Sequence, residues 1–343
     1  MRGAGWRAAL LLGLGALPLS ACAPEAGRVL AGETMGTTWR VTLLDAPSAD
    51  WRAEIEGVLA RVDARFSTWR EDSELSRFNL ARTTEWLPVS EETVRLVAEA
   101  RDVSRRTAGA FDPSVAPLVG LWGFGAAGPQ PLPPSAPALA RARARVGLTA
   151  LALREAPPAL KKHAPELALD LSGIAKGHGV DAVAERLLAL GAKRFLVEIG
   201  GELRCAGAGP HEGRWRIAIE RPRPGPAALQ RVLTLRDVAL ATSGSYRNFA
   251  TVTGERRPHV LDPRTGEPIR HGLVSVSVLA ARASLADAFA TGLLVLGPER
   301  GPALAAREGL AALFVVEREG RLREEHSPAF APYLPHPDEE PDR

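Results

Sequence analysis

Three stretches of the chain place apolar residues three or four positions apart, the spacing of an amphipathic helix: residues 51–66, 93–107 and 175–190. Gly191 follows the third stretch, where a glycine in the left-handed conformation commonly ends a helix. A further helix is predicted over residues 284–296, closed by Gly297 and Pro298. A final helix and strand pair is predicted within residues 302–317.

Apolar runs and alternating apolar positions predict the strands. They cover residues 39–43, 167–171, 195–199, 215–219, 231–235, 238–242 and 273–279. The segment 125–137 is crowded with Pro, Ala and Gly, which predicts a loop or the entry to a helical insertion. Helices and strands are mixed without strict alternation or an internal repeat, so we predict an α+β fold that forms a single unit.

The N-terminus is typical of a bacterial lipoprotein signal peptide. Arg2 and Arg7 precede an apolar run, residues 8–19, which is too short to form a permanent membrane-spanning helix without strain. The run ends in Leu-Ser-Ala-Cys at 19–22, which resembles a lipobox, so Cys22 is the expected lipidation site. The alternative is an ordinary signal peptide that happens to contain a cysteine. Lipidation at Cys22 would leave Cys205 without an intrachain disulfide partner.

We therefore expect a signal peptide at 1–21, a lipidated tether at 22–31, a folded domain at 32–326 and a mobile, Pro-rich acidic tail at 327–343. The domain would lie on the extracytoplasmic (periplasmic) face of the cell membrane, with the inner membrane favoured over the outer.

Composition excludes several classes of protein. The 343 residues are 45% hydrophobic and 24% charged, too apolar for a disordered chain, and no long apolar stretch follows the signal region. The net charge of +3 comes with only four lysines, so the cations are mostly arginines spread along the chain. No basic arm with interleaved aromatics is present, and we expect no nucleic-acid partner.

Several common catalytic motifs are absent. The sequence contains no phosphate loop of the G-x-x-x-x-G-K-[ST] type, no dinucleotide-binding G-x-G-x-x-G between strand and helix, and no H-E-x-x-H. Its seven histidines are scattered, and no G-x-S-x-G elbow is found. Serine hydrolase chemistry and the usual nucleotide folds are therefore unsupported.

The run DLSGIAKG at 170–177 reads as a strand end, a glycine turn and a lysine in the first turn of a helix. Backbone N–H groups, a helix N-terminus and the Lys176 ammonium suit an anion such as a diphosphate. A turn at Gly173 followed by a solvated lysine explains the same residues, so this motif alone leaves both alternatives open.

Asp287 and Thr291 lie four residues apart on a predicted helix, so their oxygens face the same way and suit a hard cation such as Mg²⁺. The alternative is a capping box in which Ser284 and Asp287 only close the helix N-terminus. That alternative leaves Thr291, in otherwise apolar surroundings, in need of a partner.

Two other motifs have good structural explanations. Asp262 to Gly266 has the residues of an ordinary turn, although His259 just before it is less easily explained in this way. Phe111 and Trp122 lie beside glycines and could stack on a flat ring, but packing in the core is the favoured interpretation.

The order of the motifs is more specific than any one of them. In sequence they are GETMGTT (32–38), FSTW (66–69) with SELSRFN (73–79), AFDP (110–113), LWGFG (121–125), DLSGIAKG (170–177), EIGGE (198–202), ATSGSY (241–246), HVLDPRTG (259–266) and ADAFAT (286–291). This series resembles the bacterial FAD:protein FMN transferase family, also called ApbE, over residues 32–297. The predicted lipobox agrees, since family members are often periplasmic lipoproteins.

The resemblance implies an ApbE-like fold of mixed sheets with packed helices and a Mg²⁺-dependent transferase. Such an enzyme cleaves its substrate FAD, links FMN through a phosphoester to a threonine of a partner protein, and releases AMP. Typical partners are flavoprotein subunits of membrane redox complexes. The same ion site would also serve an FAD pyrophosphatase that gives FMN and AMP, and a non-catalytic FAD-binding lipoprotein is a further alternative.

The resemblance also assigns residues. The implied FAD contacts are Met35, Trp69, Ala110, Phe111, Asp112, Asp170, Lys176 and Leu261. The implied metal ligands are the Gly173 carbonyl, Asp287 and Thr291. Lys176 would help to neutralise the diphosphate, because phosphoryl transfer gains most from positioning and from cations.

His259 is the candidate general base, because an imidazole titrates near working pH whereas Asp262 should stay ionised. The chain departs from the common family pattern at three positions. His178 and Trp69 stand where tyrosine is usual, and Ser245 stands where aspartate is frequent.

Overall fold

The computed structural model describes residues 27–45, 50–126, 128, 130, 132–223, 228–245, 249–252 and 255–334. The predicted signal peptide and the lipidation site Cys22 lie outside these residues. Within the described part, no helix is long and apolar enough to cross a bilayer.

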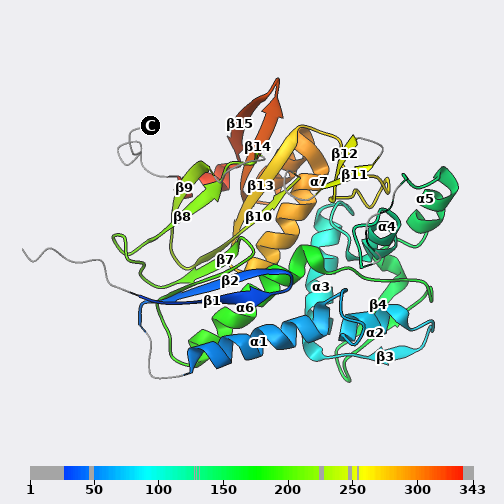
Figure 1. Ribbon diagram of the computed structural model, residues 1–343, viewed down its shortest axis with the longest axis horizontal. Coiled ribbons are helices and arrows are strands. Elements are labelled where there is room, and N and C mark those ends of the chain that lie inside the picture. Colours follow the sequence, from blue (N-terminus) through cyan, green and yellow to red (C-terminus); the bar gives the residue numbers. More distant parts are fainter. Residues whose placement is uncertain are drawn as a thin grey trace, which may run out of the picture.

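The fold is organised around one eight-stranded sheet in which every neighbouring pair is antiparallel. Its strands, in spatial order, are β1 (Arg28–Thr34), β2 (Thr37–Leu43), β6 (Phe195–Ile199), β7 (Glu202–Ala206), β10 (Val238–Gly244), β13 (Leu273–Ala280), β14 (Ala311–Arg318) and β15 (Arg321–His326). Figure 1 shows the sheet with helices packed beside it. The predicted α+β class is confirmed.

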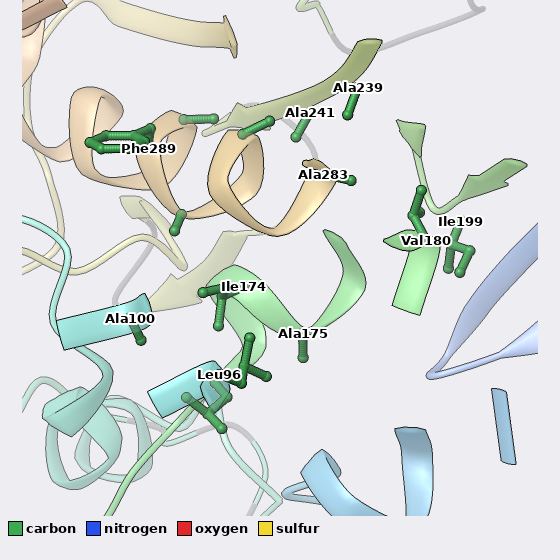
Figure 2. Packing of buried hydrophobic residues seen from close by; sticks show 14 of the residues in the cluster. Leu96, Ala100, Ile174, Ala175, Val180, Ile199, Ala239, Ala241, Ala283 and Phe289 are labelled. Atoms are coloured by element: carbon green, nitrogen blue, oxygen red, sulfur yellow. The ribbon is translucent and has the colours of Figure 1, made fainter. Parts of the chain in front are cut away.

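Four helices pack beside this sheet: α1 (Trp51–Phe66), α3 (Glu91–Arg106), α6 (Ser172–Ala189) and α7 (Ala283–Arg307). Helices α6 and α7 contact its strands directly, whereas α1 packs mainly on α6 and α3 packs on α7. The large core lies between these helices and the strands, and Figure 2 shows side chains from α3, α6, α7, β6 and β10 within it. Small residues on both sides, such as Ala241 of β10 and Ala283 of α7, let this helix lie close to the sheet.

The remaining elements are short and lie around this core. They are α2 (Glu74–Leu80), α4 (Ala116–Leu121), α5 (Ala136–Arg143), β3 (Trp86–Pro88), β4 (Leu151–Arg154), β5 (Ala159–Lys162), β8 (Trp215–Glu220), β9 (Leu229–Leu235), β11 (Phe249–Val252) and β12 (Glu255–Pro258). Strands β8 and β9 form a separate two-stranded sheet. This hairpin packs on β7, β10 and β14 and encloses a second core.

Helices α6 and α7 meet at Gly177, which has no side chain. A Cβ added to Gly177 would lie 2.3 Å from the backbone oxygen of Ala283, closer than any real contact. The start of α7 is then capped from α6, because Asp181 accepts hydrogen bonds from the N–H groups of Ala283 and Ser284 and from the Ser284 hydroxyl, all at 3.0 Å. A carboxylate is the preferred charge at a helix N-terminus.

The predicted strand at 167–171 is wrong. Leu167, Leu169 and Leu171 are buried in alternation, as a strand would require, but the segment pairs with no strand. Its backbone groups bond elsewhere, because the Asn79 side chain takes both the N–H and the carbonyl of Leu169, each at 2.8 Å. Helix α6 also begins earlier than predicted, at Ser172, so Gly173 lies in its first turn rather than in a preceding turn.

Both predicted ends of the domain are corrected. Strand β1 begins at Arg28, inside the predicted tether, because Leu30 packs in the core and the strand pairs with β2. At the other end, Pro328–Tyr333 forms a 3₁₀ helix within the predicted mobile tail, and Phe330 is fully buried in the second core. The folded domain therefore continues at least to Leu334.

We predict that Asp181→Ala lowers the free energy of unfolding by roughly 2–4 kcal/mol, because it leaves the donors at the start of α7 without an acceptor. Urea unfolding measures the change. Glu185→Ala is the matched control, since Glu185 pairs with the same Arg204 but is exposed, and should cost less than about 1 kcal/mol. Equal losses in the two variants would contradict the capping role.

Candidate functional site

The three predicted metal ligands come together where α6 crosses α7. A Cβ on Gly173 would lie only 3.4 Å from Thr291 Oγ1, so the two residues lie next to each other. One turn further along α6, the N–H of Gly177 donates to Asp287 Oδ2 at 3.1 Å. This N–H is the donor that a regular helix would direct to the Gly173 carbonyl. Tertiary packing thus gathers a carbonyl, a carboxylate and a hydroxyl.

Asp287 does not cap its own helix. The N–H and hydroxyl of Ser284 bond to Asp181 instead, and Asp287 turns its carboxylate to Gly177 and Lys176 of α6. The capping-box interpretation is therefore wrong for this pair. Asp287 is 2% exposed, so its charge must be balanced by groups inside the site.

Thr291 finds the partner that its apolar surroundings require. Its Oγ1 lies 3.0 Å from Ser243 Oγ, at the end of strand β10. The sequence did not identify Ser243 as this partner, although Ser243 lies in the motif ATSGSY (241–246). The polar end of β10 beside a polar position of α7 becomes apparent only when the two elements pack together.

The partly exposed ammonium of Lys176 lies between two buried carboxylates next to these ligands. Lys176 Nζ is 2.7 Å from Glu202 Oε1 and 3.8 Å from Asp287 Oδ1. Burial raises the pKa of Glu202 to about 7 and also raises the pKa of Asp287. Burial acts to lower the pKa of Lys176, but the two carboxylates raise it overall, so the ammonium stays charged. Glu202 was not among the predicted site residues.

These groups fit a hard divalent cation. With both acids ionised, two carboxylates face one ammonium, which leaves an excess negative charge in a buried place. The candidate ligands are all oxygens, the donors that Mg²⁺ prefers. Among the described residues there is no cluster of three or more His, Cys, Asp or Glu that could hold a metal ion.

The predicted flavin-binding segments border the same place. Phe111 is buried beside Gly173, with its Cε2 3.2 Å from where a Cβ would stand. Asp112 accepts from the N–H and hydroxyl of Ser114, and burial raises its pKa. The N–H of Asp170 donates to the carbonyl of Pro113 at 2.6 Å. Residues 110–113 and 170–173 thus lie side by side, and Phe111 is a core residue as predicted.

The segment that follows His259 contacts the region around Trp122 and Gly109. Asp262 to Gly266 forms the predicted turn, with Gly266 N–H donating to the Asp262 carbonyl at 2.7 Å. Trp122 Nε1 donates to the Gly266 carbonyl at 2.8 Å, and Arg264 packs against Gly109. The segment is therefore attached to the chain that leads into Phe111. His259 itself is partly buried and follows strand β12.

Three other predicted flavin contacts occupy different settings. Met35 lies in the β1–β2 turn and reaches α6, where its Cε is 3.0 Å from the place of a Cβ on Gly179. Trp69 is 67% exposed in the loop before α2, unusual for so large an aromatic. The side chain of Leu261 packs in a small cluster with Leu118 and Trp122.

The departures from the family pattern have different settings. The ring of His178 is partly buried and packs edge-on against Phe66, and its Nε2 lies 2.6 Å from Glu92 Oε1; desolvation lowers its pKa to about 4. The imidazole is thus a neutral member of the core between α1, α3 and α6. Ser245 follows β10, and its N–H donates to the Val274 carbonyl.

Comparison with known proteins agrees with these observations. Residues 35–314 match the ApbE family. The chain is 41% identical over 323 residues to the FAD:protein FMN transferase of Vibrio cholerae serotype O1, covering 93% of this chain and 96% of that protein. It is 38% identical over 330 residues to the protein of the same name from Klebsiella pneumoniae, covering 95% and 94%.

Two solved structures share the fold. The flavin transferase ApbE from Vibrio cholerae has a TM-score of 0.82 and 40% identity, covering 90% of this chain and all of that one. The apo form of the Pseudomonas stutzeri flavinyl transferase ApbE also has a TM-score of 0.82, with 38% identity over 90% of this chain and 97% of that one. With the match covering most of its length, this chain belongs to the ApbE family.

Proposed function

We propose that this chain is a Mg²⁺-dependent FAD:protein FMN transferase that cleaves FAD, links FMN to a threonine of a target protein and releases AMP. The observation that carries the proposal is the convergence of Gly173, Asp287 and Thr291 beside Lys176. The names of the relatives support the transferase activity and the flavin substrate.

The residues of the site would divide the work. Gly173, Asp287 and Thr291 would hold Mg²⁺, which when bound supplies Lewis-acid stabilisation of charge on the phosphate oxygens. Lys176 would offset the negative charge of the diphosphate. Trp69 would present aromatic surface toward the flat rings of FAD, and Met35, Ala110, Phe111, Asp112, Asp170 and Leu261 would complete its binding site.

The proposed transfer forms one bond to phosphorus and breaks one. The threonine oxygen forms a bond to the phosphorus of the FMN half, and the bond from that phosphorus to the AMP oxygen breaks. AMP leaves with the electron pair, and the hydroxyl proton passes to the imidazole of His259. Water in place of threonine would give FMN and AMP, the pyrophosphatase reaction.

The first test incubates the purified enzyme with FAD, Mg²⁺ and a candidate partner that bears the acceptor threonine. We expect an FMN-sized mass increase on that threonine and an equal amount of AMP. AMP and free FMN without labelled partner would instead indicate a pyrophosphatase, and FAD binding without AMP would indicate a binding protein.

His259→Gln in the same assay separates binding from proton transfer. We expect FAD binding within about threefold of wild type and labelling at least about 100-fold slower, within the range of general-base contributions. Normal labelling by this variant would exclude His259 as the base.

A further prediction concerns the cation. Asp287→Asn should reduce FAD cleavage at least about 100-fold at saturating Mg²⁺, because it removes the charged ligand, and Thr291→Val should also weaken Mg²⁺ activation. Thr291→Ser is the matched control, since it keeps the hydroxyl. A Mg²⁺ titration of AMP release measures all three, and full activity of Asp287→Asn would exclude the assigned site.

We also propose that Cys22 anchors the chain by lipid to the extracytoplasmic face of the membrane, the inner one favoured. There it would meet threonine-bearing flavoprotein subunits of membrane redox complexes. Cell fractionation tests the anchor. Cys22→Ser should move the protein from the membrane to the soluble fraction, whereas Cys205→Ser, at a buried thiol, should leave it membrane-bound. A membrane-bound Cys22→Ser protein would refute lipidation.

A further inference from the structure

Glu202 is a buried acid with one visible task. It is 3% exposed at the start of β7, and its Oε1 accepts from the Lys176 ammonium at 2.7 Å. Its other oxygen, Oε2, is buried and has no hydrogen-bond partner in the described part of the chain. A carboxylate that is so poorly satisfied is costly, and only its pairing with Lys176 compensates for the burial.

The position of Lys176 shows what this pairing does. The ammonium lies within hydrogen-bonding distance of Glu202 but 3.8 Å from Asp287 Oδ1, beyond a normal hydrogen bond. Asp287 receives the Gly177 N–H on its other oxygen. Glu202 therefore binds the ammonium more closely than the proposed metal ligand does.

We propose that Glu202 is a positioning residue that holds Lys176 away from Asp287 and so keeps the Asp287 carboxylate available to a divalent cation. Without a counter-ion at position 202, the Lys176 ammonium, whose side chain is only partly exposed, has Asp287 as the nearest opposite charge and competes with the metal for it. The inference rests on the cation site of the proposed function, but it concerns a residue outside that site's ligands.

The test measures Mn²⁺ binding to the folded protein without FAD, by the loss of the free Mn²⁺ signal in electron paramagnetic resonance. We expect Glu202→Gln, which is nearly isosteric, to weaken Mn²⁺ binding roughly 10- to 100-fold, the range for residues that orient metal ligands. Glu198→Gln is the matched control. Its carboxylate lies in the same turn but accepts from the Gly201 N–H, so binding should stay within about threefold.

A double-mutant cycle distinguishes positioning from a general effect of charge. Lys176→Met should improve Mn²⁺ binding much more in the Glu202→Gln background than in wild type, because only there does the ammonium occupy Asp287. Equal gains in the two backgrounds, or unchanged binding in Glu202→Gln, would overturn the inference. Thermal unfolding of each variant confirms that the protein is folded.

The cycle also separates this inference from the proposed function. If wild type and Asp287→Asn bind Mn²⁺ equally, the cation site is wrong and both proposals fail. If Asp287→Asn loses binding while Glu202→Gln keeps it, the cation site stands and only the role of Glu202 is refuted.

Discussion

The close crossing of α6 and α7 is the constraint on which the site depends. It exists because Gly177 has no side chain, so the helix backbone can meet Ala283 directly. The same crossing lets Asp181 of α6 cap α7, which replaces a cap from α7's own sequence. Asp287 is then free of any structural duty at its helix terminus and can face the neighbouring helix. The close packing of α6 on α7 and the orientation of Asp287 therefore have the same cause.

The charged side chains near this crossing each have different partners. Asp181 serves the helix terminus, Glu202 holds Lys176, and Asp287 is left with a backbone N–H and a distant ammonium. Buried carboxylates are tolerated when each has a donor or a counter-charge. Asp287 keeps one oxygen that no hydrogen bond of normal length engages, on the side where the other oxygen donors lie.

The segments proposed to bind the flavin substrate lie next to this crossing. Residues 110–113 and 170–173 are joined by a backbone hydrogen bond, and Phe111 lies against Gly173. The turn after His259 is tied to the same region through Trp122 and Gly109. Motifs that are more than 100 residues apart in the chain therefore border one place. Trp69 differs from them, because its ring is largely exposed and remains open to a partner.

The sequence by itself determined the elements whose signal is local. The periodicity of residues 51–66, the glycine that ends α6 and the break at Gly297 all depend on neighbours within one turn, and the structure confirms them. The family too could be recognised, because the order of its motifs is a property of the chain. Residues 167–171 show the limit of such reasoning, since their alternating burial predicts a strand but Asn79 takes the backbone groups of Leu169. Tertiary structure alone decided that Asp287 faces α6, that Ser243 is the hydrogen-bond partner of Thr291 and that Glu202 pairs with Lys176. Each of these contacts joins segments far apart in sequence, and no local pattern specifies which of many polar residues will share a buried space.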